Sequence, residues 1–67
     1  MTRTYTAVLH KEDQWYVAEC PELGTTSQGR TLEGAVKNLQ EATEVYLEEF
    51  PAHDNPRPIL TTFDVAV

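Results

Sequence analysis

The sequence has little of what several classes of protein require. It is 67 residues long and contains a single cysteine, Cys20, so it can form neither an internal disulfide nor a four-cysteine zinc site. No apolar run approaches the roughly 18 residues of a membrane-spanning helix, and the amino terminus lacks the apolar core of a signal peptide. We therefore expect a cytoplasmic protein that makes no contact with a membrane.

Basic residues are also scarce. Five lysines and arginines stand against eleven acidic residues, which gives a formal net charge of −6. Because binding to a phosphate backbone needs a basic face, we expect no direct nucleic-acid binding. The acidity has two explanations: it keeps the protein in solution, or it attracts a basic protein partner.

A chain this short forms one domain, residues 1–67, near the lower size limit for a core that folds unaided. The composition is 40% hydrophobic and 24% charged, which is typical of a globular domain rather than a disordered chain. A domain of this size buries only about 60% of the surface that its unfolded chain exposes. Oligomerisation is a natural supplement, and we expect a homodimer or homotetramer.

One stretch, residues 31–50, has the pattern of an amphipathic helix. Thr31 can cap its amino terminus, and Pro51 cannot continue it, so the helix should end at Phe50. Its apolar residues recur at the spacing of three and four that places them on one face. They are Leu32, Ala35, Val36, Leu39, Ala42, Tyr46 and Phe50.

Four stretches are predicted as strands. Residues 4–10, 15–20 and 59–67 alternate between two faces, and residues 25–28 are short and polar, as in an edge strand. If residues 11–14 form the first hairpin loop, His10 pairs with Trp15. This register gathers an uncharged set on one face, comprising Tyr5, Ala7, Leu9, Tyr16, Ala18 and Cys20.

The order β-β-β-α-β predicts an α+β fold. The sheet is four-stranded and mostly antiparallel, and a right-handed crossover through the helix places the last strand beside the first, in the order 3-2-1-4. One helix covers one face of this sheet and leaves the other uncovered.

The uncovered face carries Trp15 together with Val8, Val17 and Leu60, and is more apolar than a solvated face requires. We predict that it is a subunit or partner interface with Trp15 as its anchor. One alternative is a partly solvated sheet face without a partner. Another is that an outer strand, residues 25–28 or 59–67, pairs edge to edge with a second copy.

Residues that could carry chemistry do not converge. His10 and His53 lie far apart in the sequence without a third ligand at a diagnostic spacing, and Cys20 falls on the core face without a neighbouring base. Glu19 and Asp64 share the predicted uncovered face, which leaves a weak divalent-cation site open. We predict no catalytic residue, no metal or cofactor site, and no enzymatic activity.

Three motifs resemble the HicB-like antitoxin domain. They are a tyrosine-started strand at Tyr5, the run Trp15-Tyr16-Val17-Ala18-Glu19-Cys20-Pro21-Glu22-Leu23-Gly24, and the helix entry Ser27-Gln28-Gly29-Arg30-Thr31-Leu32-Glu33-Gly34-Ala35. The resemblance covers residues 4–50 and extends to the strand that closes at Val67. Two positions depart from the family pattern: Gly34 stands where a glutamate is usual, and residues 11–14 lack the usual hairpin glycine.

The resemblance implies a reduced ribonuclease H-like fold and a function. HicB-like domains mask a small basic toxin, HicA, that cleaves messenger RNA. Many family members add a carboxyl-terminal DNA-binding segment, for which this chain has no room after Val67, so we do not expect promoter binding.

Three functional hypotheses follow. The first is a non-catalytic, antitoxin-type module that binds a HicA-like toxin. The second is a solitary oligomeric structural or regulatory protein that has lost its toxin and binds another protein or a small ligand. The least favoured is a residual metal-dependent nuclease that uses Asp64 and Glu19.

Overall fold

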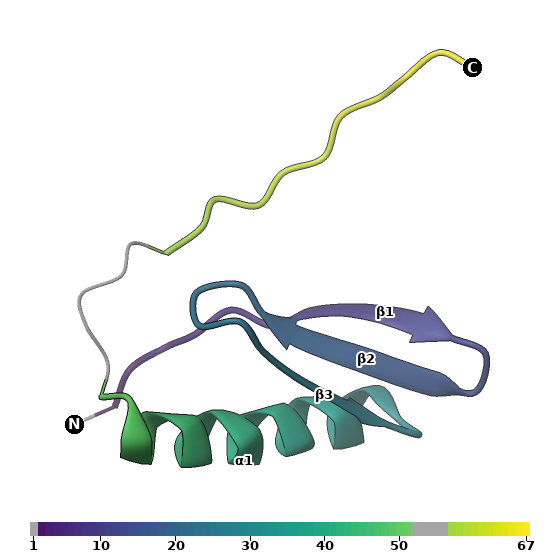
Figure 1. The fold of residues 1–67 in the computed structure, drawn as a ribbon. Helices are drawn as coiled ribbons and strands as arrows, with labels where there is room; N and C mark the ends of the chain where they lie inside the picture. The colour runs from purple at the N-terminus through teal and green to yellow at the C-terminus, as the bar shows by residue number, and fades with distance from the viewer. Residues whose placement is uncertain (1, 52–56) are drawn as a thin grey trace.

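A computed structural model of the chain describes residues 2–51 and 57–67. Its elements are three strands and one helix: β1 (Val8–Glu12), β2 (Trp15–Cys20), β3 (Thr25–Gly29) and α1 (Leu32–Glu49). The strands form an antiparallel sheet in the order β1-β2-β3, and α1 lies along one face of it (Figure 1). The α+β class and the β-β-β-α order of the prediction are confirmed.

The first hairpin is tighter than the sequence pattern predicted. Lys11 and Glu12 belong to β1, and the turn consists of Asp13 and Gln14 alone, with Glu12 opposite Trp15. Asp13 adopts a φ of 53°, in the left-handed region that aspartate tolerates better than most residues. Aspartate thus supplies the conformation for which hairpin turns usually employ glycine.

The predicted register was therefore wrong by two residues, because His10 lies opposite Val17 rather than Trp15. A slip of two keeps every side chain on its own face, since the period of a strand is two. The core side of the sheet consequently holds the predicted residues. Ala18 and Cys20 are buried there, and the side chains packed against this core include Tyr5, Ala7, Leu9 and Tyr16.

The helix begins and ends as predicted. The Thr31 hydroxyl accepts a hydrogen bond from the Gly34 amide at 2.9 Å, and the Phe50 amide closes the last turn on the Tyr46 carbonyl. Because Gly34 has no side chain, the reciprocal half of a capping box is missing. A single N-cap bond is nevertheless typically worth about 1 kcal/mol.

The buried stripe of α1 differs from the predicted apolar face. Ala35, Leu39 and Thr43 are buried against the sheet, whereas Leu32, Val36 and Phe50 are exposed. Thr43 is accommodated because its hydroxyl forms a 2.9 Å hydrogen bond with the Thr25 hydroxyl on β3. The apolar face of the helix is therefore wider than the part of the sheet that covers it.

Gly29 sets the distance between α1 and the sheet. A Cβ atom at this position would lie 2.6 Å from the Ala35 backbone nitrogen and 2.9 Å from the Gly34 carbonyl carbon. Only glycine allows the end of β3 to approach the first turn of α1 this closely.

The predicted fourth strand is not seen. Residues 57–67 are extended, form no part of the sheet, and run away from the body of the domain (Figure 1). β1 is consequently an edge strand, and the described sheet has the order 3-2-1 rather than 3-2-1-4. Backbone atoms in residues 57–67 have no ladder partner here, so local alternation alone does not make this segment a strand.

Candidate functional site

The face of the sheet opposite α1 is the candidate functional surface. Cross-strand partners point to the same side, so the pairing fixes its members. We call it the outer face; it consists of Val8, His10, Glu12, Trp15, Val17, Glu19, Thr26 and Gln28.

Trp15 is the largest apolar residue of the outer face and lies at the hairpin end of β2. Its side chain is 38% exposed, and the Arg30 guanidinium stacks over its ring at 4.8 Å from the ring centroid. Tyr16 pairs with Gly29, so one more step along the same antiparallel register brings Arg30 opposite Trp15. The result is a cation–π pair that holds a large aromatic ring at the surface.

Carboxylates border this apolar patch. Glu12 lies directly across from Trp15, and Glu19 lies across from Val8. The His10 Nε2 atom is 3.8 Å from a Glu12 carboxylate oxygen, at an exposed position where such a pair contributes little to stability. An apolar centre with acidic neighbours is suited to a basic protein surface.

The structure brings together three of the four residues that the sequence predicted for an interface. Val8, Trp15 and Val17 share the outer face, but Leu60 does not. Leu60 lies in the extended segment 57–67 and is 62% exposed, because the strand that would have carried it to the sheet is not formed.

Arg30, which stacks over Trp15 on the outer face, is a residue that the sequence interpretation missed. The sequence interpretation assigned residue-by-residue strand pairing to the first hairpin only. A register for β2 and β3 would have been sufficient to place Arg30 opposite Trp15.

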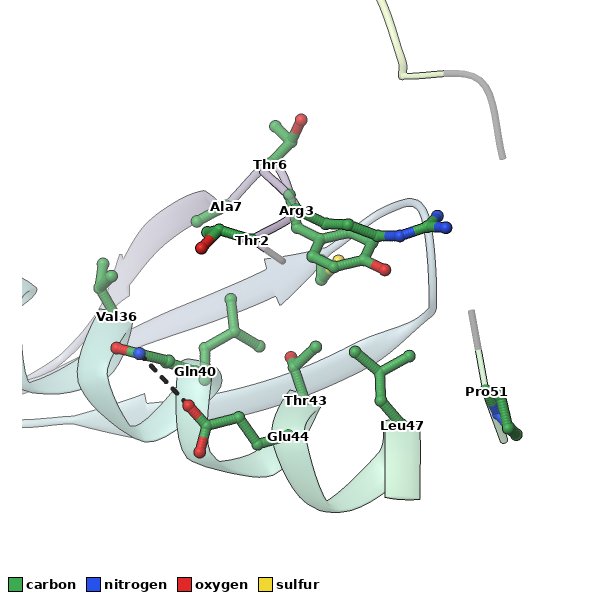
Figure 2. Close-up of a pocket in the computed structure, with 13 residues that line it drawn as sticks. Thr2, Arg3, Thr6, Ala7, Val36, Gln40, Thr43, Glu44, Leu47 and Pro51 are labelled. Carbon is green, nitrogen blue, oxygen red and sulfur yellow. Dashed lines mark hydrogen bonds between the residues drawn. The ribbon is translucent and has the colours of Figure 1, made fainter. Parts of the chain in front are cut away.

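The other side of the domain has a groove. It runs between residues 2–7 and α1, has a volume of about 710 Å³, and is lined by thirteen residues from these segments, β2 and Pro51. Figure 2 shows Val36, Thr43 and Leu47 on α1, facing Thr2 and Arg3 across the opening. The Tyr5 hydroxyl oxygen is buried at this groove, and no hydrogen-bond partner for it exists among the described residues.

Glu22 fixes the amino-terminal side of the groove. Its carboxylate accepts the Thr6 amide at 2.9 and 3.2 Å and also contacts the Cys20 thiol at 3.6 Å. Burial raises the pKa of this carboxyl, but hydrogen bonds from its own backbone, Thr6 and Cys20 together outweigh burial and leave the pKa lowered. The ionised form therefore holds residues 2–7 in place.

Residues that could have carried chemistry are dispersed. Glu19 belongs to β2, Asp64 belongs to the extended segment, and His53 lies outside the described residues. Residues 2–51 and 57–67 contain no group of three or more His, Cys, Asp or Glu side chains that could hold a metal ion. Within these same ranges, no helix has the length and apolar character needed to cross a membrane.

The fold and its site define a small α+β domain: a three-stranded antiparallel sheet, covered on one side by a helix and open on the other. The chain is 48% identical to a UPF0150 protein of Synechocystis sp. over 56 residues, which span 81% of this chain and 71% of that protein. It is 38% identical to a UPF0150 protein of Thermoplasma acidophilum over 56 residues, or 81% of each chain. A third relative is a UPF0150 protein of Helicobacter pylori, 41% identical over 49 residues, or 72% of this chain and 68% of that one.

The chain therefore belongs to the UPF0150 family. No protein-family model matches it, and no solved structure matches it. The names of these relatives identify a family and state no activity.

Proposed function

We propose that this UPF0150 chain is a HicB-like, non-catalytic protein-binding module that masks a small basic HicA-like toxin in the cytoplasm. The observation that carries the proposal is the outer face, which the exposed ring of Trp15 shares with Val8 and Val17. The motif resemblance over residues 4–50 supplies the class of partner. In its complete form the domain has a fourth strand, residues 59–67, and a reduced ribonuclease H-like sheet.

The physical basis is an aromatic anchor with acidic surroundings. Trp15 is held by Arg30 at 4.8 Å, so little side-chain entropy is lost when a partner covers it. Glu12 and Glu19 flank the patch, and the whole chain carries a net charge of −6. The negative electrostatic potential of these carboxylates attracts a basic partner and repels acidic proteins. The apolar residues of the outer face supply most of the affinity.

The test is a titration of the purified chain with a purified HicA-like toxin at low salt. Trp15→Ala is expected to weaken binding by about 30-fold or more, since an anchor of this kind is worth about 2 kcal/mol. Val45→Ala is the control, because Val45 is also an exposed apolar residue, at 63% against 38% for Trp15, but stands on α1, on the other side of the sheet. Affinity should also fall as salt is raised.

The absence of binding at low salt would remove the antitoxin proposal. Equal losses in the Trp15 and Val45 variants would remove the outer face as the binding surface. The alternative function, a solitary oligomer that binds another protein or a small ligand, is favoured if the neighbouring genes encode no short basic protein.

A further inference from the structure

The segment 57–67 exposes apolar side chains to an unusual degree. Ile59 is 94% exposed and Phe63 is 83% exposed, and both stand on the same side of an alternating pattern. The segment carries one arginine and one aspartate, so its net charge is zero. It is therefore an extended, half-apolar segment without a sheet to join, and such segments can pair with the free edge of another sheet.

The described sheet has two edges, β1 and β3, and the β1 edge is the more open. Glu12 and Trp15 close a two-residue turn, a position at which the two residues exchange backbone hydrogen bonds with each other. Hydrogen-bonded pairs alternate with non-hydrogen-bonded pairs along an antiparallel ladder. The backbone N–H and C=O groups of Leu9 and Lys11 therefore point away from β2. With β1 outermost in the described sheet, these groups have no ladder partner.

The opposite edge of the sheet is less accessible. By the same alternation, the backbone groups of Thr26 and Gln28 point outward from β3. The Gln28 carbonyl already accepts a 2.8 Å hydrogen bond from the Asn38 side-chain amide on α1. A strand that joined β3 would have to displace this hydrogen bond. A strand that joined β1 would displace no hydrogen bond of this kind.

A groove adjoins the open edge. It lies between residues 2–7, which lead into β1, and the side of α1 that carries Val36 and Leu47 (Figure 2). A strand added to β1 would place every second side chain over this groove and over Val36, which the described sheet leaves exposed. It would also bring polar backbone groups close to the unpartnered hydroxyl of Tyr5.

We propose that residues 59–67 of one chain add as the fourth strand to β1 of a second copy, and that each chain completes the groove of the other. Residues 59–67 are long enough to pair with the five residues of β1 and to continue along residues 4–7, which lead into it. The set Ile59, Thr61, Phe63, Val65 and Val67 covers the groove. The segment runs away from the sheet and helix of its own chain (Figure 1), which favours pairing with a second copy over pairing with its own sheet.

The exchange is reciprocal, since every chain carries one strand and one edge, and a two-fold dimer satisfies both. The added strand carries one charged side chain, Asp64, which stands on the side of the alternating pattern opposite Ile59 and Phe63, so no carboxylate of the strand enters the groove of the second chain. The side chains on the other side of the added strand would extend the outer face, with Leu60 of the second copy next to β1. The inference needs no toxin and is independent of the proposed function.

The test compares the solution mass of the full chain with that of two variants by light scattering. Phe63→Glu places a charge in the groove, whereas Thr62→Glu places the same charge one residue away on the other side of the strand. The proposal predicts a wild-type dimer, at least a tenfold weaker dimer for Phe63→Glu, and a wild-type dimer for Thr62→Glu. Both variants lie outside the described sheet and helix, so circular dichroism should show a folded domain.

Amide hydrogen exchange on the wild type distinguishes exchange from other arrangements. Protection of residues 59–67 that disappears on dilution to the monomer supports the proposal. A monomeric wild type overturns the proposal. If the amides of residues 59–67 are protected in that monomer, the strand joins its own sheet; if they are not protected, it joins no sheet. A dimer that is unaffected by Phe63→Glu also overturns it and would direct attention to the Trp15 face.

Discussion

Replacing Gly29 by alanine should destabilise the domain far more than a methyl group usually does. The added Cβ would lie 2.6 Å from the Ala35 nitrogen and 3.0 Å from the Ala35 Cα atom, whereas ordinary contact begins at 3.4 Å. These are backbone atoms in the first turns of α1, so no side chain can rotate out of the way. The helix must move from β3 by about 0.8 Å at its start, a shift read from those two distances.

The magnitude follows from the size of the domain. Overpacking of this kind costs about 1–3 kcal/mol. A 67-residue domain is stable by only about 3–10 kcal/mol, so the loss is a large share of the total. A loss of 2 kcal/mol corresponds to a decrease in Tm of about 8–16 °C in a domain this small.

Thermal unfolding followed by circular dichroism measures the effect, and Gly34→Ala is the control. There the new Cβ meets only the Thr31 hydroxyl, at 2.9 Å, so the gain of about 1 kcal/mol in helix propensity is offset by a weakened cap of similar size. We expect Gly34→Ala to melt near the wild type. A Gly29→Ala protein that also melted within about 2 °C of the wild type would refute the close packing of α1 on β3.

Three further perturbations test the local contacts. Thr31→Ala removes the N-cap bond to α1 and should cost about 1 kcal/mol in the free energy of unfolding, measured by urea titration. Because the pKa of Glu22 is lowered from 4.5 in the folded state, its contribution is present above that pH and is lost as the pH falls through the folded pKa. Glu22→Gln should therefore flatten the decline in Tm below about pH 4.5, and an unchanged decline would contradict the hydrogen bonds to Thr6. Arg30→Ala should change the fluorescence of Trp15 and cost about 0.5–1 kcal/mol, and an identical emission spectrum would argue against the stacked pair.

Much of the architecture could be predicted from the sequence because it depends on local signals. Thr31 and Pro51 bound the helix through capping and backbone chemistry that act within one turn. The faces of the first hairpin survived a register error of two residues, since the alternation of side chains has that same period. The error itself arose at Asp13, whose left-handed conformation allows a two-residue turn without glycine.

The parts that were missed depend on contacts between distant residues. Thr43 does not look like a core residue until Thr25 provides a hydrogen-bond partner eighteen positions away. Arg30 becomes part of the site only through the register of β2 against β3. The alternating pattern of residues 59–67 indicates a strand but cannot specify which edge it joins, or in which copy of the chain.

The most direct test of the central claim uses the one tryptophan in the chain. A ¹⁵N-labelled sample gives a single indole N–H resonance, from Trp15, which can be followed while a HicA-like toxin is added at low salt. The account predicts that this resonance moves or broadens together with the amides of Val8 and Val17, while the amides in the exposed side of α1 around Val45 stay unchanged. Shifts confined to α1, with an unmoved indole resonance, would contradict the claim that the outer face binds the partner.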